Sequence, residues 1–130
     1  MPRVAFTVTL HHGRPYLLAE ASGPCGVADL CGSADMMRTV AHRLGYRRVL
    51  ADLRETQPAL SFTEHLQLGS HIAAALGDLE RVATVVRQQD RVGTSEKAAQ
   101  KSGLRFRTFT DFAEAQAWIS AAPAGTDTAS

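Results

Sequence analysis

The first group of residues that could do chemistry follows an apolar run near the middle of the chain. Asp52 and Arg54 end that run, and Ser61 comes after a proline. Residues 61–64 read S-F-T-E, the spacing of a capping box, in which the serine oxygen accepts the backbone N–H of Glu64 and the glutamate side chain reaches back. This spacing predicts that Ser61 is first of all a helix cap. Asp52 and Arg54 are candidates for contacting a partner or an anion.

A second group lies between residues 87 and 97, which read RQQDRVGTSEK. A glycine, two hydroxyls and several cations surround a predicted helix start, where free N–H groups and the helix dipole favour an anion. Thr94 acting as a cap between solvated neighbours is the simpler interpretation, and a bound phosphate or carboxylate is the alternative. The G-x-x-x-x-G-K-[ST] spacing of a nucleotide-hydrolase phosphate loop does not occur. The candidates for contacting a partner or an anion here are Arg87, Arg91, Gly93, Thr94, Ser95 and Lys97.

A catalytic centre is hard to assemble from the sequence. Glu64 and His65 are consecutive, so on a helix their directions differ by about 100 degrees, and His71 lies six residues after His65 on another face. The patterns G-x-S-x-G and H-E-x-x-H do not occur. Cys25 and Cys31 have no second cysteine pair and no nearby histidine, which disfavours both a zinc site and a disulfide. We therefore expect that the protein is not an enzyme and that it binds no metal and no cofactor.

Length and composition indicate one domain. The chain has 130 residues, 45% of them hydrophobic, which is enough for a single core. A net charge of +1 gives no general attraction to nucleic acid or to membranes. No apolar segment approaches the length of a membrane span, and no secretory signal pattern opens the chain. We expect a cytoplasmic protein with one domain over residues 1–121 and a disordered tail over residues 122–130.

Hydrophobic periodicity predicts strands that alternate with helices. The expected strands cover residues 4–10, 15–21, 47–54, 82–86 and 104–108, and the expected helices 27–44, 62–76, 94–102 and a last one that begins after Asp111. Gly23-Pro24 is expected to end the second strand. The second helix is expected to bury Phe62, Leu66, Ile72, Ala73 and Leu76. This order predicts an α/β fold with a five-stranded, mixed, mainly parallel sheet and connecting helices, in which the first strand is the antiparallel one.

With these elements in place, the chain resembles the SpoIIAA-like family, which is related to STAS domains and is often described as STAS/SEC14-like. The matching blocks read RRVLADLR, LSFTEHLQLG, RVATVV, GTSEKAA and FTDFAEAQAW, and the resemblance covers roughly residues 4–120. It implies that helices join successive strands as turns of a βα superhelix. It implies no established enzymatic activity.

The same resemblance suggests a regulatory role for one serine. The better-known STAS domains are antagonists of anti-sigma factors, in which a serine or threonine at the start of the helix after strand three is phosphorylated within a pattern such as D-S-S-G or D-S-T-G. Here the corresponding residues 60–63 read LSFT, so the serine is present without the preceding acid and the following glycine. Ser61 is thus the candidate phospho-switch, and its first role is that of a cap.

We expect a non-enzymatic interaction or regulatory module. Its working surface would be the carboxyl ends of the third and fourth strands with the helix starts beyond them, where an open α/β sheet meets its ligands. The alternative is a protein that binds a small anionic metabolite or a lipid head group at the helix start between Gly93 and Lys97. The expected partner is a protein or a small anionic ligand, without nucleic acid or a membrane span, and a homodimer is left open.

Overall fold

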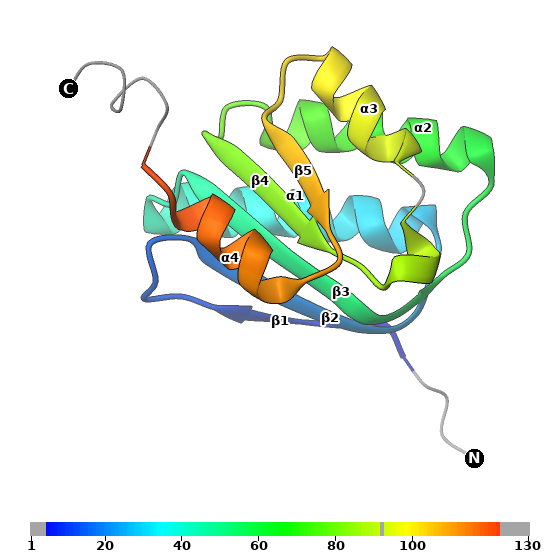
Figure 1. Ribbon diagram of the computed structural model, residues 1–130, viewed down its shortest axis with the longest axis horizontal. Helices are drawn as coiled ribbons and strands as arrows, with labels where there is room; N and C mark the ends of the chain where they lie inside the picture. The colour runs from blue at the N-terminus through cyan, green and yellow to red at the C-terminus, as the bar shows by residue number, and fades with distance from the viewer. Residues whose placement is uncertain (1–4, 92, 123–130) are drawn as a thin grey trace.

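A five-stranded mixed sheet forms the centre of the computed structural model, which describes residues 5–91 and 93–122 apart from the side chain of Ser95 (Figure 1). The strands follow one another in chain order: β1 (Thr7–His11), β2 (Leu17–Cys25), β3 (Arg48–Pro58), β4 (Arg81–Val85) and β5 (Phe106–Phe109). β1 is antiparallel to β2, and all other neighbours are parallel. The predicted sheet is confirmed, while the predicted tail lies outside the described residues from residue 123 onward.

Helices cover both faces of this sheet. α1 (Val27–Leu44), α2 (Phe62–Leu76) and α3 (Thr94–Lys101) contribute to the core on one face, and α4 (Phe112–Ser120) packs on the other, as Figure 1 shows. A 3-10 turn, η1 (Gln88–Asp90), joins β4 to α3. β3 is buried on both faces, because Val49 and Ala51 belong to the first core and Leu50 to the second. Among the described residues, no helix has the length and apolar character of a membrane span.

Two strands are longer than predicted. β2 continues through Gly23-Pro24 to Cys25 instead of ending there, and β3 continues past Arg54 to Pro58. Among the described residues, β1 pairs with β2 only as far as Ser22, and beyond that residue the strand that pairs with β2 is β3. A proline is tolerated at such a position because no neighbouring strand needs its N–H. In the described part of the chain, the glycine and the proline are therefore paired with β3 and with no other strand.

A β-bulge near the end of β3 determines which side chains turn toward α2. Glu20 of β2 is opposite Asp52, but Ser22 is opposite Glu55, so β3 holds one more residue than β2 over this stretch. An extra residue reverses the alternation of side chains along the strand. Leu53 lies on the α2 side before the bulge, and Thr56 and Pro58 lie on that side after it. Thr56 is consequently buried, with only 2% of its surface exposed.

α2 has the predicted bounds but buries a different stripe. The expectation that Phe62 and Leu66 belong to the core is wrong, since they are 68% and 39% exposed. Ile72 and Leu76 are buried as predicted, and Ala73 packs against the core. The helix has two apolar stripes, and the buried one includes small residues that permit close packing against α1 and α3. That stripe consists of Leu68, Gly69, Ile72, Ala75 and Leu76.

Candidate functional site

The start of α2 carries the predicted capping box. Ser61 has an extended backbone and its Oγ accepts the N–H of Glu64 at 3.2 Å, while Glu64 Oε1 accepts the N–H of Ser61 at 2.9 Å. Both residues lie at the start of α2, shortly after the end of β3, and Ser61 is exposed. The hydroxyl is therefore accessible to another protein even though it also caps the helix.

An exposed apolar pair lies directly beside this cap. Phe62 and Leu66 are four residues apart on α2, so their side chains are neighbours on the helix surface. Contiguous exposed apolar side chains are a common feature of surfaces that bind other molecules. We call Ser61, Phe62 and Leu66 the α2 surface.

Asp52 and Arg54 form a closed pair on the α4 side of the sheet. The guanidinium of Arg54 donates from Nε to Oδ1 of Asp52 at 2.9 Å and from Nη2 to Oδ2 at 2.7 Å, and it lies 5.1 Å from the ring centroid of Phe112 on α4. Burial raises the pKa of the Asp52 carboxyl, but the hydrogen bonds and charge of Arg54 outweigh burial and hold that pKa below its usual value. The pair is thus ionised and internally satisfied.

The predicted anion site between β4 and α3 contains carboxylates as well as cations. Arg87 Nε donates to Asp90 Oδ2 at 2.8 Å. Arg91 Nη2 lies 3.7 Å from Glu96 Oε1 and donates to the Thr108 carbonyl at 3.3 Å. A bound anion would therefore have to compete with two resident carboxylates for these arginines.

The start of α3 differs from the prediction in one respect. Gly93, with φ of 85°, is the residue that precedes the helix, and Thr94 is the first helical residue, so the expectation of a Thr94 cap is wrong. The left-handed backbone at this position favours glycine, which is why the helix begins after it. None of the described side chains caps α3. Lys97 is exposed on its first turn.

The sequence-predicted residues thus fall into three places instead of the two groups that the sequence indicated, because the first group is divided between the two faces of the sheet. The α2 surface lies on the side of α1, α2 and α3, and the Asp52–Arg54 pair lies against α4 on the opposite face of the sheet. Arg87, Arg91 and the residues from Gly93 to Lys97 form the connection between β4 and α3.

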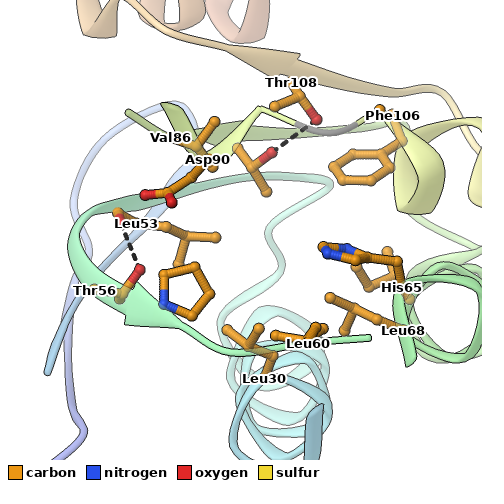
Figure 2. A pocket seen from close by; sticks show the side chains of 14 residues that line it. Leu30, Leu53, Thr56, Leu60, His65, Leu68, Val86, Asp90, Phe106 and Thr108 are labelled. Atoms are coloured by element: carbon orange, nitrogen blue, oxygen red, sulfur yellow. Dashed lines mark hydrogen bonds between the residues drawn. The ribbon is translucent and has the colours of Figure 1, made fainter. Parts of the chain in front are cut away.

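The structure adds a cavity that the sequence did not predict. It has a volume of about 80 Å³ and lies between the sheet, where β5 and the carboxyl-terminal halves of β3 and β4 line it, and the helices α1 and α2. Figure 2 shows His65 and Phe106 at one end of this cavity and Asp90 and Thr56 at the other. His65 lies three residues before Leu68 on the buried stripe of α2, so a histidine on the core face was the signal that could have found it.

The two cysteines lie apart from these candidate residues, and both of their thiol pKa values are raised. Burial raises the pKa of the Cys25 thiol, and the nearby Asp29 carboxylate raises it further, so this sulfur stays protonated. Burial likewise raises the pKa of the Cys31 thiol. In the part of the chain that the structure describes, no three His, Cys, Asp or Glu side chains gather as metal ligands would.

Comparison with known proteins identifies the fold. No family model and no curated protein matches the sequence. An uncharacterised DUF3478-family protein with a SpoIIAA-like fold from Shewanella loihica PV-4 is 18% identical, with a TM-score of 0.56 over 92% of this chain and 97% of that one. An anti-sigma factor antagonist from Mycobacterium paratuberculosis is 13% identical, with a TM-score of 0.58 over 90% and 96%. Unphosphorylated SpoIIAA, an anti-sigma factor antagonist, is 12% identical, with a TM-score of 0.55 over 91% and 100%. The chain therefore has the SpoIIAA-like fold that the sequence blocks predicted.

Proposed function

We propose that this protein is a non-enzymatic, cytoplasmic regulatory module that binds a protein partner through the α2 surface, where β3 ends and α2 begins. The observation that carries the proposal is the exposure of Phe62 and Leu66 beside the accessible Ser61. Two solved structures with the same fold are anti-sigma factor antagonists, which supports a regulatory role of this general kind.

The size of the expected binding effect follows from the exposed side chains. Burying one phenylalanine side chain completely is worth about 1.5–3 kcal/mol. Phe62 is already about one-third buried in the free protein, so its contact with a partner should contribute about 1–2 kcal/mol. Loss of Phe62 should weaken binding by roughly five- to thirtyfold. Stability should change little, because the side chain makes a minor contribution to the core.

The experiment compares three baits in pull-downs from the native cell extract. Wild-type protein and Leu44→Ala, a control at an exposed leucine near the end of α1, should retain the same partner. Phe62→Ala with Leu66→Ala should lose it. Titration calorimetry with the purified partner then measures Kd. If the double variant retains the same proteins, the proposal that the partner binds at the α2 surface is refuted. Sedimentation of each bait distinguishes self-association of the protein from binding of a different protein.

Ser61 is tested in the same assay. If Ser61 acts only as a cap, Ser61→Asp binds the partner like the wild type, because aspartate caps the helix as well. If phosphorylation of Ser61 controls binding, the added charge should change Kd about tenfold with little change in stability. We expect the first outcome, since the Glu64 carboxylate already occupies the helix start beside the serine.

The anionic ligand remains a second candidate, favoured by the absence of a capping side chain on α3 among the described residues. Free N–H groups at that helix start attract anions. Titration with inorganic phosphate, followed through the amide resonances of Gly93 to Lys97, tests it. Because Asp90 and Glu96 already pair with the two arginines, we expect only weak binding.

A further inference from the structure

The cavity beside α2 is large enough to receive part of a ligand. Its volume of about 80 Å³ adjoins a second void of about 50 Å³, and the two share six lining residues. An apolar cavity of about 150 Å³ accommodates benzene. The two voids together are somewhat smaller than that cavity, so they suit at most one ring or a short branched chain. The shared residues are Leu30, Leu53, Leu68, Ile72, Thr84 and Phe106.

One polar atom in this apolar lining has no partner. Thr84 donates its hydroxyl to the Thr108 hydroxyl at 3.2 Å, and Thr56 donates to the Leu53 carbonyl at 2.6 Å, as Figure 2 shows. By contrast, Nδ1 of His65 is buried and has no hydrogen-bond partner among the described residues. A buried polar atom without a partner is costly, and a ligand that supplies the partner recovers that cost.

We propose that this cavity binds a small, neutral, mainly apolar molecule whose single hydroxyl pairs with Nδ1 of His65. A hydroxyl both donates and accepts, so it suits either tautomer of the imidazole. A carboxylate is disfavoured because Asp90 lines the same cavity. The proposal does not depend on the α2 surface, because its residues are different and its test uses no protein partner.

Phenol and benzene form a matched pair of probes, since they differ by one hydroxyl. Each is titrated into the isotope-labelled protein while amide resonances are recorded. Phenol should cause saturable shifts at Thr84 and Thr108, which line the cavity. His65→Leu should weaken phenol about tenfold, or 1.4 kcal/mol, and leave benzene unchanged or tighter. Non-saturable shifts with both probes, or equal effects of His65→Leu on both, would overturn the proposal.

Two further measurements separate a ligand site from a packing defect. Leu60→Phe places a larger side chain in the cavity lining and should abolish phenol binding, whereas Leu44→Phe, far along α1 at an exposed position, should leave it unchanged. The melting temperature of His65→Leu without ligand should equal or exceed that of the wild type. A clear fall in that temperature would assign Nδ1 a structural partner and overturn the proposal, as would phenol binding that survives Leu60→Phe in a folded protein.

Discussion

Replacing Ser61 by alanine measures what the capping box contributes to α2. The Ser61 hydroxyl accepts one N–H at 3.2 Å, and Glu64 accepts the N–H of Ser61 at 2.9 Å. Alanine removes only the first bond, because its own backbone N–H can still donate to Glu64. One lost cap acceptor costs about 1 kcal/mol. We therefore expect the free energy of unfolding to fall by about 1 kcal/mol, and not by the sum of two bonds.

Urea denaturation followed by circular dichroism tests this number. The slope of unfolding free energy against urea should stay constant, so the change appears in the midpoint. In a domain of this size a loss of 1 kcal/mol lowers Tm by roughly 3–6 °C. Ser61→Asp should remain within about 0.5 kcal/mol of wild type, and Ser61→Gly should lose only a few tenths, because both are accepted at the N-cap position.

The outcome that would refute the reasoning is specific. If Ser61→Ala has the wild-type midpoint, the hydroxyl contributes nothing as a cap, and solvation of the exposed N–H of Glu64 must replace it fully. If Ser61→Asp is as unstable as Ser61→Ala, repulsion between its carboxylate and that of Glu64 outweighs capping. Glu64→Gln in the aspartate background distinguishes these cases, because removing the second charge should restore stability only in the latter.

Two further predictions concern the strands. Gly23→Ala should destabilise the protein more than Gly13→Ala, by at least about 1 kcal/mol in the same urea assay. Both glycines have a positive φ, but of the two only position 23 would bring a new Cβ against a neighbour, the Ala5 carbonyl oxygen at 2.5 Å. Equal losses of stability would contradict this prediction. The lowered pKa of Asp52 means that its contribution to stability is present above its usual value of 3.8 and is lost as the pH falls through the folded value. Asp52→Asn should therefore lose less stability than wild type on acidification below about pH 4, and parallel curves would show that Arg54 does not perturb this carboxyl.

The parts of the fold that could be predicted depend on local pattern. The buried run of β3 and the capping box at Ser61 can each be recognised from a few consecutive residues. α1 ends at Leu44, and Gly45 directly after it has a left-handed φ of 77°, the conformation that a glycine after a helix predicts. The bounds of β2 and β3 could not be predicted in this way. Whether Pro24 ends β2 depends on where β1 stops pairing, which is a property of the sheet and not of the segment.

The face of α2 illustrates the same limit. Phe62 and Leu66 fit a helical apolar stripe as well as Leu68 and Ile72 do, so periodicity alone could not decide which pair is buried. Packing against α1 and α3 determines which stripe is buried. The other stripe, with Phe62 and Leu66, becomes the exposed surface on which the proposed function depends. A wrong core assignment thus marks the candidate interface.

The cavity required two tertiary events that no local pattern contains. The bulge in β3 reverses the alternation of side chains after Asp52 and so turns Thr56 toward α2. In a regular strand Thr56 would point to the opposite face of the sheet. β5 then brings Phe106 to the same space from more than forty residues away in the chain, opposite His65. Periodicity could have flagged a histidine on the core stripe, but only the bulge and the order of the sheet leave a void beside it. The unpartnered nitrogen of His65 is therefore a property of the assembled fold, and its chemistry can be tested only in the folded protein.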